Sequence, residues 1–433
     1  MGQWSTTDPG RSLSKTVDWR IIGCYLFLTI FGWLNIFAAV HATQDASIFS
    51  LDCNAGKQFL WLITGICLAI LILFVLPSHI WEVLTKPAYF IVLGLLVLVI
   101  FVGGTTKGSN SWFELGPVKF QPAELSKITT ALMLATAMSK PTFHLSRFTD
   151  LLKAAIIIGV PMLTIVAEKE TGSALVYVGF LFVLYREGLS GWYLFMLLMA
   201  IVTFILALKT SWLIAVLAVA AACAWYCIKY YRSTRSRRLR RAALTRTILS
   251  FIAGVVLIFS TNYVFNNILQ PHQQKRIEVL LGMEEDLRGA GYNVHQSMIA
   301  IGSGGLFGKG YLNGTQTTYG FVPEQSTDFI FCTVGEEWGF FGCLVVIAAY
   351  ALMIWWIIED ADSARERFTR VYGYCVASTL FMHLIINIGM TIGLMPVIGI
   401  PLPLFSYGGS SLWAFTAMIF IFLALNRRER KYF

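Results

Sequence analysis

Two carboxylates stand at the edge of an apolar run in the segment FVPEQSTDFIF, residues 321–331. Glu324 and Asp328 are four residues apart, and this spacing predicts one helical turn between them. A carboxylate in the first turn of a helix is favoured by the helix dipole alone, which is the structural interpretation. The apolar sequence FIFCTV that follows instead predicts that Asp328 lies close to the lipid boundary. Lost hydration there raises the pKa of a carboxyl group towards the range of a general base, and we favour this interpretation.

A second charged pair opens another predicted helix, in QPAELSK at residues 121–127. Pro122 suits the first turn of a helix, and Glu124 and Lys127 then lie three residues apart on one helical face. A charge pair at the start of a membrane span is costly to bury. The pair either satisfies only itself, or Glu124 holds Lys127 as a cation for an anionic substrate.

The long segment 270–333 has too regular a pattern for a linker. KRIEVLL (275–281) and HQSMIAIG (295–302) predict short amphipathic helices, and the glycines between 302 and 310 allow tight turns. A glycine-rich loop is a weak signal when it stands alone. The segment also supplies cations, among them Lys275, Arg276 and Arg288.

Three prolines interrupt the segment 393–411, GLMPVIGIPLPLFSYGGSS. Non-helical backbone at membrane depth persists only where it is buried in protein or lines a cavity. The last apolar run then opens with N–H groups that face outward, which is a seat for an anion such as phosphate. A plain helix cap is the equal alternative. The candidate substrate-binding residues here are Ser406, Gly408, Gly409 and Ser410.

These groups together predict a class of reaction. One carboxylate base, several cations and a helix start suited to phosphate favour group transfer from a lipid-linked phosphate or pyrophosphate donor. The charge of that leaving group must be countered by cations or by a divalent metal such as Mg²⁺, and the sequence leaves the metal open. The sequence has no GxxxxGK[ST] motif and so no sign of ATP-driven work.

The elements that must position these groups are membrane helices. Of all residues 57% are hydrophobic and only 13% are charged, which predicts an all-α polytopic membrane protein with one membrane domain over residues 1–433. Glu336 and Glu337 fall inside one span and should face the interior of the bundle. The apolar runs predict about twelve spans, at 21–42, 58–76, 87–103, 123–140, 153–168, 173–187, 190–208, 211–229, 248–269, 334–358, 371–395 and 409–426.

Basic residues fix the predicted orientation. They precede the first run, follow the last, and cluster in the loop 229–247, and even numbers of spans separate these three places. Both termini and this loop are therefore predicted to be cytoplasmic, with 103–123, 167–173, 270–333 and 396–408 outside. The net charge of +9 is concentrated beside the spans, so we expect contact with anionic membrane lipids and no nucleic acid.

Four stretches resemble the SEDS family of cell-shape, division and sporulation proteins: ELGPVKFQPAELSK, GAGYNVHQSMIAIGSGGLFGKG, GTQTTYGFVPEQSTDFIFCTVGEEWGF and NIGMTIGLMPVIGIPLPLFSYGGSS. The motifs occur in order over nearly the whole chain. The resemblance implies a bundle of about 10–12 membrane helices with a large outer loop. It implies a peptidoglycan glycosyltransferase of the cytoplasmic membrane, which polymerises lipid II into undecaprenyl-pyrophosphate-linked glycan beside a class B penicillin-binding protein.

The resemblance also assigns residues. The family's essential loop aspartate falls on Asp328, and its glutamate–lysine pair falls on Glu124 and Lys127. Two positions depart from the family pattern, because Ser111 replaces an arginine and Glu170 replaces an aspartate. Lys127, Arg276 and the Gly408–Ser411 helix start are the candidates for the leaving group. Glu324 is a further candidate in the substrate site, where it shapes the loop or the charge of the site because Pro323 holds it outside the helix.

Two other functions fit parts of the pattern. A transporter that flips lipid II would also use broken helices and intramembrane carboxylates, and a non-catalytic scaffold would only hold the crosslinking partner. The transporter predicts critical charges along a path through the bundle, whereas the polymerase predicts them on the outer face. Since Asp328 is predicted on the outer face, the polymerase is favoured.

Overall fold

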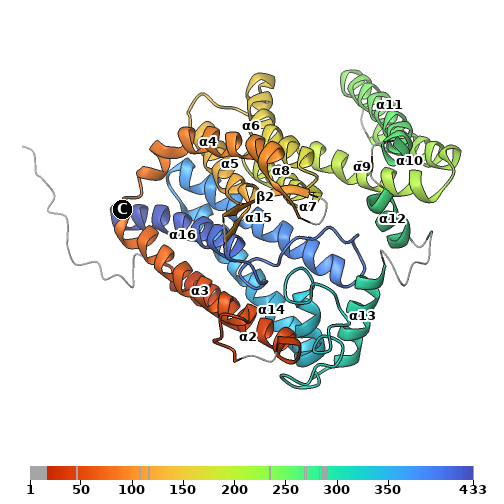
Figure 1. The fold of residues 1–433 in the computed structure, drawn as a ribbon. Coiled ribbons are helices and arrows are strands. Elements are labelled where there is room, and N and C mark those ends of the chain that lie inside the picture. Colours follow the sequence, from red (N-terminus) through yellow and green to blue (C-terminus); the bar gives the residue numbers. More distant parts are fainter. Residues whose placement is uncertain are drawn as a thin grey trace, which may run out of the picture. The chain divides into compact units, whose positions relative to one another are not determined.

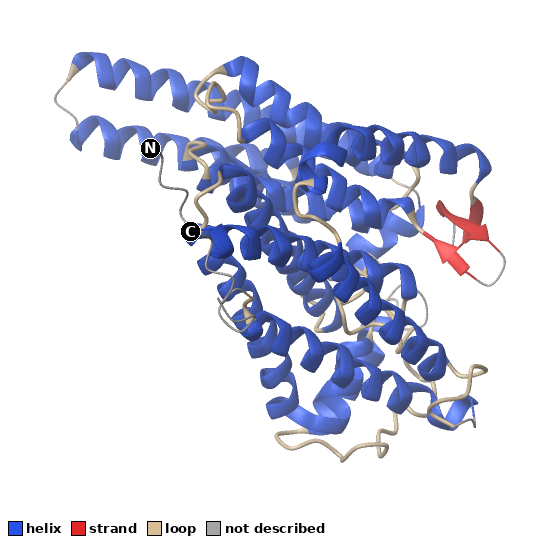
Figure 2. Ribbon diagram, turned by 90° about the vertical axis from the view of Figure 1, so that its left-hand side faces the viewer, coloured by secondary structure: helices blue, strands red, loops and turns tan. Residues whose placement is uncertain are grey.

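The computed structural model describes residues 17–44, 47–106, 109–115, 118–233, 236–267, 269, 271–281, 283 and 291–432. These residues are mostly helical, with three short strands (Figures 1 and 2). The predicted fold class, an all-α membrane bundle, is confirmed. The chain divides into two compact units, residues 1–188 with 293–433 and residues 189–292, while the single membrane domain stays a prediction.

The first unit contains most of the helices. In chain order they are α2 (Trp19–Gln44), α3 (Asn54–Ile70) with the π-helical turn η1 (Leu71–Val75), α4 (Ile80–Val102), α5 (Pro122–Met138), α6 (Phe148–Ala167), α7 (Thr171–Val176), the 3₁₀ turn η2 (Tyr177–Gly179), α8 (Phe180–Arg186), α13 (Tyr292–Gly304), α14 (Ile330–Ser363), α15 (Arg367–Thr391) and α16 (Gly409–Tyr432).

Helix α15 is the centre of this unit. It packs against α5, α8, α14 and α16, and most of its side chains are buried (Figure 1). Helix α2 packs against α14, and α3 against α16. A helix that is buried on every side can hold polar residues only if its neighbours supply hydrogen-bond partners. Polar side chains of α15 are therefore positioned by the helices around it.

A small antiparallel sheet joins α4 to α5. Its strands are β1 (Gly104–Thr106), β2 (Ser109–Leu115) and β3 (Val118–Phe120), in the order β1-β2-β3 (Figure 2). The sequence predicted only an outer loop here, because strands of three to seven residues give little periodicity. The sheet ends just before Pro122, which is the first residue of α5 as predicted.

Ten of the described helices are long and apolar enough to cross a membrane. The other two predicted spans, 123–140 and 173–187, are also helical but shorter. Helix α5 has 17 residues, and α7, η2 and α8 together cover Thr171–Arg186. At about 1.5 Å per residue, 17 residues cover roughly 25 Å, somewhat less than a hydrocarbon core of about 30 Å.

The second unit contains α9 (Gly191–Lys209), α10 (Trp212–Ser233), α11 (Arg237–Asn267) and α12 (Pro271–Leu280). The basic cluster was predicted as a cytoplasmic loop at about 229–247, and its place relative to the membrane stays a prediction. Its described residues lie largely on the end of α10 and the start of α11, since Arg and Lys are good helix formers. Helices α12 and α13 confirm the two short helices predicted in the segment 270–333.

Candidate active site

Asp328 lies in a series of turns that runs from residue 322 to 329 and ends where α14 begins at Ile330. The predicted helical turn between Glu324 and Asp328 is therefore wrong. Glu324 has a positive φ of 58°, and its carbonyl oxygen accepts hydrogen bonds from the N–H groups of Thr327 and Phe329. Its carboxylate accepts another from the Thr327 hydroxyl at 2.9 Å. Glu324 thus closes the turn that presents Asp328.

Three successive carbonyl oxygens of this turn are held by residues of other elements. The bonds are Tyr407 N to Ser326 O at 2.9 Å, Ser406 Oγ to Thr327 O at 2.6 Å, and Asn387 Nδ2 to Asp328 O at 2.8 Å. In a helix these oxygens would accept from amides four residues later. Tertiary partners replace those amides, which explains why the helix begins only after Asp328.

The Asp328 side chain is half-buried and lies against Gly399. Gly399 has a φ of 76°, and a Cβ added there would come within 3.3 Å of Asp328 Oδ2. Glycine therefore satisfies the backbone and leaves room beside the carboxylate. The buried Asn387 amide donates both to Asp328 O and to Ile400 O, each at 2.8 Å, so one side chain fixes the turn and the proline-rich segment together.

Ser406 has an internal role in this arrangement. Its buried hydroxyl donates to Thr327 O and accepts from Leu402 N–H at 2.8 Å. The first bond holds the turn of residues 322–329 on the segment that precedes α16, and the second orders that segment itself. Contact between Ser406 and a substrate stays a prediction.

Glu124 and Lys127 form the predicted pair in the first turns of α5, with 2.8 Å between Glu124 Oε1 and Lys127 Nζ. Lys127 is only 1% exposed, and its ammonium also lies 2.9 Å from His383 Nε2 and 5.1 Å from the centroid of the Phe415 ring. A lysine enclosed in this way does not present its charge to a substrate. The geometry favours the interpretation in which the pair satisfies itself.

His383 connects this pair to the Asp328 turn. Because Lys127 donates to Nε2, the proton of the imidazole belongs on Nδ1, which lies 3.2 Å from Pro401 O. His383 and Asn387 are four residues apart on α15 and so lie on one helical face. That face ties the ion pair, residues 400–401 and the backbone of Asp328 into one network.

The sequence reasoning missed His383 and Asn387. Both are fully buried polar side chains in an apolar helix. Such residues are costly inside a membrane and mark functional positions. Their spacing of four residues within the run 371–395 could therefore have identified both as candidate site residues.

Some of the groups at the start of α16 that were predicted to bind an anion already contact other residues of the protein. The N–H of Gly408 donates to Gln58 Oε1 at 3.1 Å, and a Cβ on Gly409 would come within 2.8 Å of the Trp61 ring. Gly409 thus allows α3 and α16 to approach closely. The N–H of Gly408, which belongs to the predicted anion seat, is used internally. Ser410 lies half-buried in the first turn of α16, and its contact with an anion stays a prediction.

Glu336 and Glu337 are buried as predicted. The Glu336 carboxylate accepts hydrogen bonds from Lys309 Nζ at 2.6 Å and from backbone N–H groups of residues 315–317. The glycines of residues 304–310 pack against the backbone of α14, where a Cβ on Gly304 or Gly308 would collide with it. This glycine-rich segment therefore serves packing, and Glu336 organises the loop that follows it.

The predicted cations of the long loop lie in the other unit. Lys275 and Arg276 are half-buried on α12, and Arg288 lies outside the described residues. Their proximity to Asp328 stays a prediction. Within the described part of the chain, no group of three or more His, Cys, Asp or Glu side chains is arranged to hold a metal ion, and the metal stays open.

Ser111 and Glu170, the two residues that depart from the family pattern, are in contact with each other. The buried Ser111 hydroxyl of β2 donates to Glu170 Oε1 at 2.6 Å. Nearby Glu168 directly follows the last residue of α6 and is 1% exposed. Neither of its carboxylate oxygens has a hydrogen-bond partner among the described residues. Burial and the neighbouring Glu170 raise the pKa of Glu168 to about 8.

This raised pKa predicts a pH dependence of stability. The folded state keeps a proton on Glu168 that the unfolded chain releases above its pKa of 4.5, so this carboxyl lowers stability as the pH rises from 4.5 to about 8. Glu168→Gln should raise the free energy of unfolding at pH 8.5 by roughly 1–3 kcal/mol and change it little at pH 5. Thermal unfolding in detergent at both pH values measures this. An equal effect at both, or the same effect from exposed Asp52→Asn, would contradict the assignment.

Comparison with known proteins gives consistent matches. The family model of FtsW, RodA and SpoVE, described as "Cell cycle protein", matches residues 18–241 and 239–431. The peptidoglycan glycosyltransferase MrdB of Escherichia coli K12 is 32% identical over 357 residues, covering 82% of this chain and 81% of that protein. The peptidoglycan glycosyltransferase RodA of Treponema pallidum is 30% identical over 443 residues, covering 95% and 98%.

A solved structure, "Structural coordination of polymerization and crosslinking by a peptidoglycan synthase complex", contains a chain with the same fold. That chain aligns with a TM-score of 0.69 at 24% identity, covering 97% of this chain and 99% of its own length. The family match spans almost all described residues and contains both the Asp328 turn and the Glu124–Lys127 pair. The chain therefore belongs to the FtsW/RodA/SpoVE family of cell cycle proteins, the SEDS family that its motifs resemble.

Proposed function

We propose that this protein is a peptidoglycan glycosyltransferase that polymerises lipid II at the outer face of the cytoplasmic membrane during cell elongation. The two relatives named as peptidoglycan glycosyltransferases match most of the chain. The observation that supports the proposal best is the Asp328 turn. The Asp328 carboxylate is half-buried, the backbone of Asp328 is held by Asn387, and Gly399 leaves space beside the carboxylate. A carboxylate held in this way is suited to accept a proton at a defined position.

Asp328 acts as the general base in this proposal. It takes the proton from the 4-hydroxyl of the acceptor sugar, and that oxygen attacks the anomeric carbon of the growing glycan. The new C–O bond forms as the bond to undecaprenyl pyrophosphate breaks, so the pyrophosphate leaves with the electron pair. One displacement with one base inverts the anomeric configuration and gives a β-linked product.

The leaving-group end needs positive charge. Because Lys127 is enclosed, we assign it to holding the site together through His383 rather than to contact with pyrophosphate. Arg276, with Lys275, and the remaining N–H groups of the α16 start are the candidates for that contact. A divalent cation such as Mg²⁺ would supply further charge.

The test is a glycan assay with purified protein and lipid II, with and without the partner. We propose a class B penicillin-binding protein as that partner, in keeping with the synthase complex whose chain shares this fold. Polymer formed in either arm, and lost in Asp328→Asn, supports the proposal. Lipid II that crosses a vesicle bilayer without polymer would favour the transporter, and polymer that depends only on the partner's own active site would favour the scaffold.

The proposed orientation places both termini and the basic cluster in the cytoplasm, from the positive-inside rule. In a cysteine-free background, Ser236→Cys should resist a membrane-impermeant thiol reagent added to intact cells, because Ser236 lies between the basic ends of α10 and α11. Tyr319→Cys is the matched control, since Tyr319 is 69% exposed in the predicted outer segment and should be labelled readily. Labelling of position 236 before lysis would overturn the topology.

A further inference from the structure

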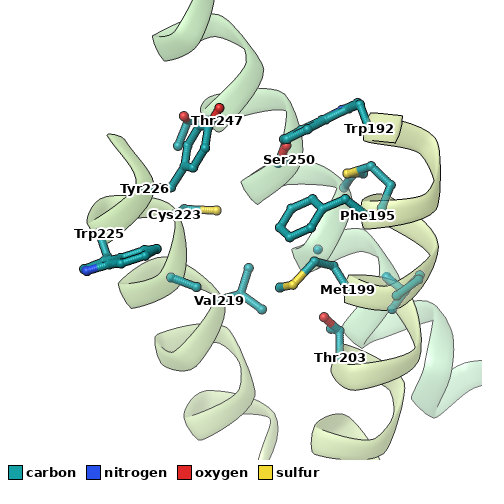
Figure 3. A pocket seen from close by; sticks show the side chains of 16 residues that line it. Trp192, Phe195, Met199, Thr203, Val219, Cys223, Trp225, Tyr226, Thr247 and Ser250 are labelled. Carbon is teal, nitrogen blue, oxygen red and sulfur yellow. The ribbon is translucent and has the colours of Figure 1, made fainter. Parts of the chain in front are cut away.

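A cavity of about 340 Å³ lies among α9, α10 and α11, entirely within the second unit (Figure 3). Its walls are aromatic rings, methionines and small residues, including Trp192, Phe195, Met199, Val219 and Tyr226. This volume is at the lower end of the range for small-molecule sites, which is about 300–1,000 Å³. The catalytic proposal makes no use of this cavity.

Two of the hydroxyls in the wall are directed to their own helix. Thr247 Oγ1 donates to Ala243 O at 2.9 Å, and Ser250 Oγ donates to Arg246 O at 2.8 Å. Both donors are thereby satisfied within α11. Because most of the lining residues are apolar, a ligand that fits these walls is a hydrocarbon and not a polar group.

The length of the cavity matches one leaflet of a membrane. Its wall runs from Trp192 to Thr203 on α9 and from Thr247 to Leu257 on α11. At about 1.5 Å per residue these stretches cover roughly 15–17 Å, close to half of a hydrocarbon core of about 30 Å. A helix about 10 Å across would fill 340 Å³ within roughly one turn, so a partner's membrane anchor does not fit inside.

Positive charge lies at one end of the cavity. Lys229 Nζ is 4.9 Å from the ring centroid of Trp225, which lines the cavity, and exposed Arg232 follows one turn later. The sequence has no acidic residue from 188 to 277, so no carboxylate of this unit's membrane helices offsets these cations. Cations beside an apolar slot are complementary to a lipid with an anionic headgroup.

We propose that this cavity holds one acyl chain of an anionic glycerophospholipid from the cytoplasmic leaflet, with its phosphate beside Lys229 and Arg232. The chain fills the slot among α9, α10 and α11, and the two cations select the headgroup. The cavity belongs to the second unit and the Asp328 turn to the first, and the inference does not depend on the glycosyltransferase proposal.

The first experiment uses the full chain in nanodiscs of phosphatidylcholine and phosphatidylglycerol at 3:1, followed by native mass spectrometry. The wild type should retain phosphatidylglycerol over phosphatidylcholine. Ala222→Phe fills the cavity and should reduce retained lipid at least tenfold, while Ala224→Phe, on the same helix outside the cavity wall, should not. Lys229→Gln with Arg232→Gln should remove the headgroup preference, unlike Lys209→Gln on α9.

The second experiment does not depend on folding of a variant. Phosphatidylglycerol with a photoreactive acyl chain is incorporated into nanodiscs with the wild type, and the labelled peptides are mapped. Labels on the cavity-lining residues of α9, α10 and α11 support the proposal. Equal retention of both lipids, labels spread evenly over all membrane helices, or co-purified polyprenyl phosphate in place of the phospholipid would each overturn it.

Discussion

Replacing Asp328 with Asn should abolish glycan polymerisation while leaving expression and partner binding intact. The substitution keeps the shape of the side chain and removes its basicity, and a general base typically contributes a factor of about 10²–10⁴ to the rate. The turn should persist, because Asn387 and Ser406 bind backbone oxygens of residues 328 and 327 and not the carboxylate. We therefore expect a loss of activity without a loss of fold.

The measurement is the rate of polymer formation from lipid II by purified protein, with thermal unfolding as the check on folding. Asp52→Asn is the matched control, because Asp52 is an exposed aspartate that belongs to no part of the candidate site. It removes the same charge and should keep nearly full activity. If Asp328→Asn polymerises lipid II at a near-normal rate, the assignment of the base is wrong.

Lys127→Met should be the most destabilising single change at the site. It leaves the Glu124 carboxylate buried without its cation, and Glu124 Oε2 already has no hydrogen-bond partner among the described residues. Breaking a buried ion pair in this way costs about 3–5 kcal/mol, whereas replacing both partners with neutral groups is far milder. The double variant Glu124→Gln with Lys127→Met should therefore recover much of the lost stability.

Thermal unfolding in detergent, together with the glycan assay, measures this coupling. Lys153→Met is the control, because Lys153 pairs with Asp150 at the same i, i+3 spacing but is 65% exposed. It should change the free energy of unfolding by less than about 1 kcal/mol. If both single variants and the double variant were harmless in both assays, the pair would have no role.

Several features of this protein were determined by the sequence alone, because their causes are local or are distributed along the chain. Apolar runs of sufficient length become membrane helices, and Pro122 begins α5 because the first helical turn needs no proline N–H. Glu336 is buried because a carboxylate inside a span has to find donors, and the next loop supplies them. The ordered motifs were enough to identify the family.

The tertiary structure alone decided how the site is held. Asp328 precedes its helix because the side chain of Asn387, 59 residues later in the sequence, donates a hydrogen bond to its carbonyl oxygen. Lys127 is enclosed because His383, 256 residues away in the sequence, lies 2.9 Å from its ammonium group. Ser111 and Glu170 meet across 59 residues in the same manner. Periodicity and capping rules describe neighbours within a turn or two of the chain, so they contain no information about partners brought together by packing on α15.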